Sequence, residues 1–310
     1  MKVAIIGGTG YVGSYLVDAL LSHGHHPILL VRPGSSRKVG QADRCTLVSG
    51  DVKNEDTVRE LVAQAEAVIY NVGILREFPQ RDITFKDLQY KGACHAMHAA
   101  LDSGVERFLL TSANGARMYG TAYQHTKYLA EKCLLASKLA GTVFRPSVIF
   151  GPPPNGCSEF ATRLVHEMIK PIIPAPLFFD GFVPFGAGSF PLAPIHARDV
   201  AEIYVRALED SATVKQTYSL CGPDRLAWRD IIRTIAQAVG RDKWMVPTSV
   251  ALLKVVAAAF EDRDRFPITR DQLTMLMEGN VCDSSEVFEK FGITPMRFNE
   301  QNLSYLHERA

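Results

Sequence analysis

The feature that most constrains this chain is a glycine-rich turn that directly follows a short apolar segment near the N-terminus. Residues 3–6 read Val-Ala-Ile-Ile, and Gly7, Gly10 and Gly13 then follow the pattern G-x-x-G-x-x-G. An amphipathic stretch continues to Leu21. This order predicts a strand, a tight turn and the beginning of a helix.

The glycines of such a turn have separate physical roles. The first permits the turn, the second lets the backbone approach a phosphate, and the third lets the helix pack closely on the strand. Backbone N–H groups at the helix N-terminus then face a dinucleotide pyrophosphate. The alternative is a structural turn that binds nothing. The residues that we expect to contact a cofactor here are Gly7, Thr9, Gly10, Tyr11, Val12 and Gly13.

Composition excludes several other classes of protein. The chain has 310 residues, 47% of them hydrophobic, and a net charge of +1, which is typical of a globular protein without a nucleic-acid-binding surface. The most apolar segment, 250–260, is too short to span a bilayer and contains Lys254. Met1 leads straight into the first strand, so we expect no cleaved targeting peptide and a cytoplasmic location.

The six cysteines are scattered and show no zinc-ligand spacing. We therefore expect no metal site. We expect buried thiols in a reducing compartment instead. The cysteines are Cys45, Cys94, Cys133, Cys157, Cys221 and Cys282.

The first half of the chain alternates short apolar segments with helical stretches. Continuous apolar strands separated by helices predict a parallel sheet that is covered on both faces, so the expected fold is α/β, a Rossmann doubly wound sheet. The expected strands are residues 3–6, 28–31, 46–48, 67–71, 107–111 and 142–149.

The composition changes after Gly151, where residues 171–194 are rich in Pro, Gly and Phe and cannot form a long helix. Helical patterns then resume, with one strand at 217–221. We expect a nucleotide-binding domain over 1–150 and a smaller, mostly helical lobe over 151–310, with the chain crossing between them. A ligand would lie in the cleft near the carboxyl ends of the strands.

The end of the second strand bears on the choice of dinucleotide. A site that prefers NAD places an acidic residue there to bind the ribose 2′-hydroxyl, whereas this strand ends in Arg32. The following loop includes Ser35 and Arg37, which suit a 2′-phosphate. We expect NADP(H) in preference to NAD(H). The alternative is that these are solvated loop residues.

Two further strand ends carry polar residues. Asp51, after the third strand, can accept from an adenine amino group while Val52 packs on the ring. The alternative for Asp51 is an N-cap of the next helix. The segment Asn71-Val72-Gly73, after the fourth strand, would contact the cofactor from the other side.

A tyrosine and a lysine lie one helical turn apart after the fifth strand. On a helix, Tyr123 and Lys127 share one face, and an ammonium near the phenol lowers the pKa of the tyrosine toward the range useful for proton transfer. Lys127 can also bind the nicotinamide ribose. Such a pair arises easily by chance, and its alternative is an exposed helix pair.

Taken in order, these motifs resemble the extended short-chain dehydrogenases/reductases, an epimerase-like group, over essentially the whole chain. The resemblance is closest to the atypical branch that includes the accessory nucleotide-binding subunit of respiratory complex I and its bacterial relatives. The motifs that carry it are the glycine turn, Gly50-Asp51-Val52, Thr111-Ser112, Tyr123 with Lys127, residues 145–152, residues 196–201 and Gly222-Pro223-Asp224.

The resemblance implies roles for several residues. Tyr123 would be the general acid/base with Lys127 as its partner, Thr111 would lie at the cofactor, and Pro146 and Val148 would line the nicotinamide. Family enzymes carry a Ser or Thr just after the fifth strand to orient substrate, but here Ala113 occupies that place. Either Ser112 substitutes through a shifted loop, or the substrate-orienting group is missing.

Two functions follow from this pattern. The first is an NADPH-linked oxidoreductase, or an enzyme of epimerase or dehydratase type. It would act on an apolar substrate such as a quinone, lipid or isoprenoid carbonyl, because 171–190 has few charges. The alternative for this stretch is packed core and turns. The second is a non-catalytic NADP(H)-binding subunit or sensor that docks on a membrane complex. The segment 246–260 could then face a partner or a membrane, or it could be a core helix.

Overall fold

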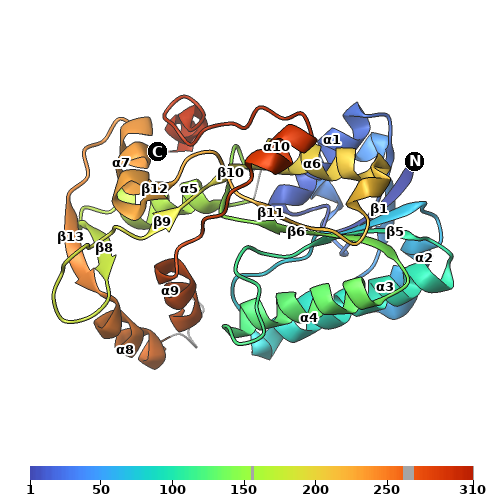
Figure 1. Ribbon diagram of the computed structural model, residues 1–310, viewed down its shortest axis with the longest axis horizontal. Coiled ribbons are helices and arrows are strands. Elements are labelled where there is room, and N and C mark those ends of the chain that lie inside the picture. The colour runs from blue at the N-terminus through green and yellow to red at the C-terminus, as the bar shows by residue number, and fades with distance from the viewer. Residues whose placement is uncertain (155–156, 261–268, 310) are drawn as a thin grey trace.

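The computed structural model describes residues 1–154, 157–260 and 269–309 (Figure 1). Its centre is a seven-stranded sheet in the order β11-β6-β5-β4-β1-β2-β3, in which every pairing is parallel. The strands are β1 (Lys2–Ile6), β2 (His26–Val31), β3 (Thr46–Ser49), β4 (Ala67–Tyr70), β5 (Arg107–Thr111), β6 (Ala140–Pro146) and β11 (Thr217–Leu220). The expected Rossmann doubly wound fold is confirmed.

The sheet order contains the switch point that creates a ligand crevice. Strand β1 lies between β2 and β4, so the connection after β2 and β3 returns across the sheet to the other side of β1. Loops that leave the carboxyl ends of β1 and β4 therefore diverge to opposite faces. The glycine turn after β1 opens onto this crevice.

Helices cover both faces of the sheet, as Figure 1 shows. On one face α1 (Tyr11–Ser22) packs with α6 (Ala197–Glu209), and their apolar side chains share a core with β1 and β2. On the other face lie α2 (Glu55–Val62), α3 (Gly92–Asp102) and α4 (Ala122–Ala136), over a second core. Burial on both faces explains why the strands read as continuous apolar segments.

The seventh strand and one covering helix come from beyond residue 150. Strand β11 pairs with β6, and α6 packs on α1, so the chain returns to the nucleotide-binding sheet after visiting the other lobe. The expected strand over 142–149 is interrupted: β6 ends at Pro146, which has no N–H to donate, and β7 (Ile149–Phe150) pairs with β10 (Ile195–His196) instead.

The second lobe has its own apolar core around Trp228, whose ring stacks on Phe190 and lies near Phe178. Part of the aromatic stretch over 171–190 is therefore packed core. Its elements are α5 (Phe160–Leu164), β8 (Ala175–Phe179), β9 (Pro191–Leu192), β12 (Leu226–Ala227), α7 (Trp228–Ala238), β13 (Met245–Ser249), α8 (Val250–Phe260), α9 (Arg270–Met277) and α10 (Ser285–Lys290).

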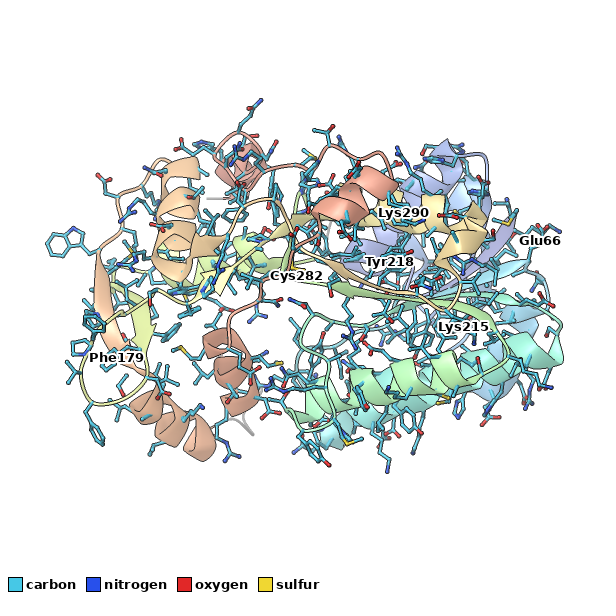
Figure 2. The ribbon with its side chains drawn as sticks, in the orientation of Figure 1. Glu66, Phe179, Lys215, Tyr218, Cys282 and Lys290 are labelled. Atoms are coloured by element: carbon cyan, nitrogen blue, oxygen red, sulfur yellow. A yellow bond between two sulfur atoms is a disulfide. The ribbon has the colours of Figure 1, made fainter. Side chains whose placement is uncertain are left out.

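The expectation that all six cysteines are free thiols is wrong for two of them. A disulfide joins Cys221, at the end of β11, to Cys282, which is labelled in Figure 2. These residues are 61 positions apart in sequence, but the fold brings their Cα atoms within 5.6 Å. Scattered spacing alone could not reveal this contact. Among the described residues, no helix is long and apolar enough to cross a membrane.

Candidate functional site

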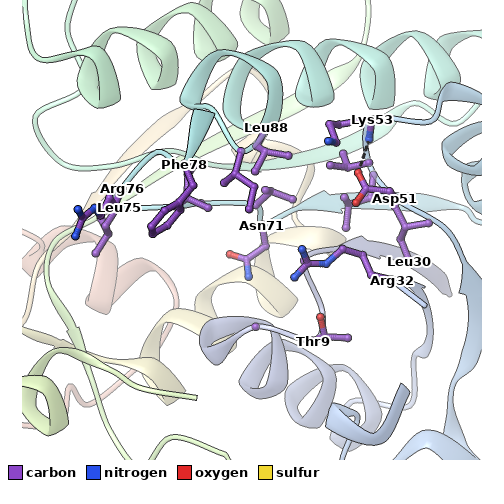
Figure 3. A pocket seen from close by; sticks show the side chains of 18 of the residues that line it. Thr9, Leu30, Arg32, Asp51, Lys53, Asn71, Leu75, Arg76, Phe78 and Leu88 are labelled. Atoms are coloured by element: carbon purple, nitrogen blue, oxygen red, sulfur yellow. Dashed lines mark hydrogen bonds between the residues drawn. The ribbon is translucent and has the colours of Figure 1, made fainter. Parts of the chain in front are cut away.

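A cavity of about 710 Å³ lies at the carboxyl ends of β1, β2, β3 and β4 (Figure 3). Each strand contributes residues to its wall at the point where the strand ends. From the expected cofactor residues, the lining includes Gly7, Thr9, Gly10, Arg32, Asp51, Val52, Asn71, Val72 and Gly73. The crevice expected from the sequence therefore exists, and nine of the expected residues meet in it.

The glycine turn packs as its spacing predicts. Gly7 has φ +101°, and a Cβ there would lie 2.6 Å from the carbonyl oxygen of Asn71. A Cβ on Gly13 would lie 2.2 Å from the carbonyl oxygen of Gly7. Gly10 is the N-cap of α1 and supplies no side chain to bind the first N–H groups of the helix. These donors remain available to an anion at the edge of the cavity.

Arg32 lines the cavity directly after the end of β2. Figure 3 shows its side chain directed into the space between Asp51 and Asn71. It forms no ion pair within the part of the chain that the structure describes. Ser35 and Arg37, on the loop that follows, do not line the cavity. The structure therefore brings only one of the three residues expected for a 2′-phosphate to the site.

Asp51 is not the N-cap of α2, so that alternative is excluded. Asn54 is the cap, and its side chain accepts from the N–H groups of Asp56 and Thr57. One Asp51 carboxylate oxygen accepts from the Lys53 N–H at 3.0 Å, shown by a dashed line in Figure 3. The carboxylate faces the cavity with further capacity to accept a hydrogen bond.

A buried network holds Asn71 at the end of β4. The Thr111 hydroxyl donates to Asn71 Oδ1 at 2.9 Å and accepts from the Tyr204 hydroxyl at 2.9 Å. Thr111 does not line the cavity itself. Its contact with the cavity is indirect, because it orients the amide of Asn71.

Lys127 is buried, and its ammonium links two strand ends. Its Nζ donates to the carbonyl oxygens of Val72 at 3.0 Å and Thr111 at 2.8 Å. Burial lowers the pKa of this lysine to about 8, and the charge of Glu131 opposes that shift. Lys127 is therefore not an exposed helix residue. It lies behind the wall formed by Val72 and Gly73.

Tyr123 lies one turn earlier on α4, where its ring packs edge-on against Phe85 at 5.7 Å between centroids. Its hydroxyl forms no hydrogen bond to any residue within the described ranges. Burial raises its pKa to about 12. The expectation that Lys127 lowers the pKa of Tyr123 is wrong for this structure, because the lysine donates to backbone carbonyls and not to the phenol.

Ser112 does not take the substrate-orienting place. Its hydroxyl donates to Glu131 inside the protein, and Glu131 also accepts from Arg145 Nε at 2.8 Å. Ser112 is buried and does not line the cavity. Its only donor is committed to a buried carboxylate, which favours the alternative that the substrate-orienting group is missing, and a catalytic use of Ser112 stays a prediction.

Five other expected cofactor residues lie outside the cavity wall, and Gly13, in the first turn of α1, is one of them. The Tyr11 hydroxyl donates to the Gly151 carbonyl at 3.2 Å, and Val12, on α1, packs against the core. Pro146 is buried at the end of β6, and Val148 packs on the core of the second lobe. None of these five residues lines the cavity.

Sequence reasoning missed one wall of the cavity. It is formed by the segment after β4, which carries Leu75, Arg76, Phe78, Arg81 and Ile83, with Arg163 and Gln272 from the second lobe. Gln272 Nε2 donates to the Leu75 carbonyl at 3.0 Å, which connects α9 to this wall. The sequence feature that could have indicated this wall is Phe78, which has an arginine on each side in the sequence. Both guanidinium groups lie 5.5 Å from its ring centroid.

The sequence pattern of the NAD dependent epimerase/dehydratase family matches residues 3–221, from the first strand of the sheet to its last. The chain belongs to this family. The match includes the glycine turn, the residues of the Tyr123–Lys127 pair and the return strand β11. It confirms the resemblance that the motifs indicated.

Individual relatives are distant. The chain is 23% identical, over 97% of its length and 78% of the relative, to the NADH-ubiquinone oxidoreductase 40 kDa subunit, mitochondrial, of Neurospora crassa. It is 26% identical to the ceramide reductase of Caulobacter vibrioides, over 77% of the chain and 70% of the relative. In fold, it is similar to the UDP-glucose 4-epimerase of Thermus thermophilus, with a TM-score of 0.73, 18% identity and coverage of 100% and 99%.

Proposed function

We propose that the chain binds NADP(H) in this cavity and reduces an apolar carbonyl or quinone-like substrate. The observation that carries the proposal is Arg32. It lies where a site selective for NAD has an acidic side chain, it is directed into the cavity, and it has no ion-pair partner within the described ranges. A 2′-phosphate would neutralise it through charge-assisted hydrogen bonds.

The residues present fit a dinucleotide. The free N–H groups of α1 would bind the pyrophosphate, Asp51 would accept from the adenine amino group, and Asn71 would face the ribose and phosphates. The volume of about 710 Å³ is in the range of cofactor sites. A bound nicotinamide dinucleotide supplies a hydride at its ring.

Tyr123 is not among the residues that line the cavity, and we propose that a substrate reaching it from the cavity takes its proton. A pKa raised to about 12 keeps its phenol protonated at neutral pH, which suits donation to a carbonyl oxygen rather than abstraction of a proton. Lys127 holds the ends of β4 and β5 together and carries a positive charge beside the ribose region. A proton donor in this role favours reduction of the substrate carbonyl by the cofactor.

An apolar substrate suits the wall that faces the second lobe. Leu75, Phe78 and Ile83 line it. The guanidinium groups of Arg76 and Arg81, in the same wall, lie over the Phe78 ring. Arg163, from the second lobe, pairs with Glu167 at 3.1 Å. The relative from Caulobacter vibrioides is named a ceramide reductase, and a ceramide-like lipid would belong to the same chemical class.

A second function is favoured by the burial of Ser112. With Ala113 at the substrate-orienting place and the Ser112 hydroxyl bound to Glu131, the site lacks the usual donor beside the tyrosine. The chain would then act as a non-catalytic NADP(H)-binding subunit of a membrane complex, as the name of the Neurospora crassa relative suggests. Under either function, we propose that the chain lies peripherally at a membrane.

One experiment separates the two functions. NADPH absorbance is followed with a panel of quinones and apolar carbonyls, for the wild type and for Tyr123→Phe. We expect turnover in the wild type and its loss in the variant, with NADPH affinity unchanged in both. Tight NADPH binding without turnover across the panel would support the subunit instead. The absence of any NADPH binding would overturn both.

A further inference from the structure

One end of the molecule carries exposed apolar side chains on loops that surround the β8–β13 ladder. Figure 1 shows β8, β13 and α8 together at the end of the long axis, remote from α2, α3 and α4. We define the apolar tip as Ile172, Ile173, Phe182, Val183, Phe185, Trp244, Val246, Leu252 and Val255, all of which are exposed. None of them lines the cofactor cavity.

The pairing of the two strands explains why these residues share one end. β8 and β13 run parallel, with Ala175 opposite Met245 and Phe179 opposite Ser249. Residues 171–174 therefore lie beside 241–244, and the Ala175 N–H donates to the Trp244 carbonyl at 2.8 Å. Residues 180–187 and the beginning of α8 lie at the other end of a ladder about 17 Å long. Figure 2 shows this region around Phe179.

The exposure of the tip is too high for incidental surface residues. Phe185 is 94% exposed and Trp244 is 82% exposed, while Ile172 and Phe182 are fully exposed. Single exposed apolar residues are common on proteins, but many large ones around one short pair of strands mark an interaction surface. These side chains come from loops, from β13 and from α8 rather than from one element, which suits a fluid apolar phase.

Basic residues border the apolar tip. Segments 170–187 and 241–255 contain four bases, Lys170, Arg241, Lys243 and Lys254, and two acids, Asp180 and Asp242. Lys170, Arg241 and Lys243 line one cavity of about 410 Å³ together with Ile172 and Trp244. Lys170 and Arg241 have no ion-pair partner within the described ranges. Aromatic side chains next to unpaired bases match the headgroup level of an anionic bilayer.

We propose that the apolar tip inserts into the headgroup region of a bilayer that contains anionic phospholipids, with Lys170 and Arg241 on the lipid phosphates. This inference rests on the part of the proposed function that places the chain at a membrane. It does not require a bound nucleotide. The tip would hold the chain at the surface where apolar substrates are dissolved.

Vesicle co-sedimentation tests the proposal. Wild-type protein is mixed with vesicles of phosphatidylcholine alone and of an equimolar mixture with phosphatidylglycerol. We expect stronger binding to the mixture, and weaker binding as salt is raised. The double variant Phe182→Ser with Phe185→Ser should lose roughly tenfold or more in partitioning. The double variant Lys170→Gln with Arg241→Gln should lose about 30-fold on the mixture only.

A matched control removes two bases elsewhere. Lys132→Gln with Lys138→Gln, on and just after α4, lowers net charge equally but should leave vesicle binding unchanged. The proposal would be overturned if the wild-type protein bound neither kind of vesicle, or if the tip variants bound the vesicles as well as the wild type does. Tip variants that change the sedimentation coefficient without changing vesicle binding would also overturn it, because the tip would then be a protein interface.

The thermal shift with NADPH on the same samples separates this inference from nucleotide binding. A normal NADPH shift without vesicle binding would overturn only the membrane surface. Vesicle binding without an NADPH shift would overturn only the cofactor proposal.

Discussion

The ammonium of Lys127 lies 2.8 Å from the carbonyl oxygen of Thr111, and the same ammonium reaches the Val72 carbonyl at 3.0 Å. One buried charge thus joins the carboxyl ends of β4 and β5. The residues after β4 form part of the cavity wall, so the lysine supports that wall from behind.

Replacing Lys127 by Met should destabilise the fold, because the buried Thr111 carbonyl and the partly buried Val72 carbonyl lose their donor. We expect a loss of about 2 kcal/mol in the free energy of unfolding, measured by urea titration. Lys132→Met, on the exposed side of the same helix, should change it by less than about 0.5 kcal/mol. Equal losses in the two variants would contradict the structural role of Lys127.

Ser112→Ala should affect stability rather than turnover. Its hydroxyl donates to Glu131, so the variant leaves a buried carboxylate with one partner fewer and should lose about 1–2 kcal/mol of unfolding free energy. The value of kcat should remain that of the wild type. A large fall in kcat with unchanged stability would instead return Ser112 to the substrate.

Arg32→Asp should reverse the preference between the two dinucleotides. The variant places a carboxylate where we propose that the 2′-phosphate binds, so NADPH affinity should fall at least about tenfold while NADH affinity holds or improves. Calorimetric titration with both dinucleotides measures this. Arg37→Asp, on the same loop but outside the cavity wall, should have a much smaller effect. Equal losses for both dinucleotides would remove the 2′-phosphate argument.

Two groups at the beginning of α6 should oppose each other in the pH dependence of stability. Burial lowers the pKa of His196 from 6.5 to about 4, so the unfolded chain binds more protons in that window and stability rises with pH. Burial raises the pKa of Asp199 from 3.8 to about 6, so the native state binds more protons and stability falls with pH.

Asp199→Asn should therefore expose a rise in stability between pH 4 and pH 6.5, the window set by His196. His196→Asn, which keeps a side-chain acceptor for the Arg198 N–H, should expose a fall between pH 4 and pH 6. Urea midpoints across this range give both slopes. Curves parallel to that of the wild type would show that neither group titrates as described.

Gly13→Ala should disrupt the turn and the site together. The new Cβ would lie 2.2 Å from the Gly7 carbonyl oxygen, so α1 must move away from β1. We expect a loss of about 2 kcal/mol or more of unfolding free energy and no detectable dinucleotide binding. Gly40→Ala is the control, because a Cβ there meets nothing within 4 Å. An intact NADPH thermal shift in Gly13→Ala would contradict the close packing.

The sequence by itself determined the features that depend on local chemistry. Apolar strands, the glycine turn and the helix that follows it are encoded by neighbouring residues, so the doubly wound sheet and nine residues of the cavity could be predicted. Arg32 is one of these nine residues, and it could be predicted because the position of a residue at a strand end determines which edge of the sheet it reaches.

Tertiary structure alone decided where side chains point and which distant segments meet. Ser112 turns toward Glu131 because a buried carboxylate on α4 offers its hydroxyl a better acceptor than open solvent. Cys221 bonds to Cys282, and Gln272 donates to the Leu75 carbonyl. Both pairs are far apart in the sequence, so no local sequence pattern predicts these contacts. Residue spacing specifies the backbone within an element, whereas contacts between elements depend on the packing of the whole chain.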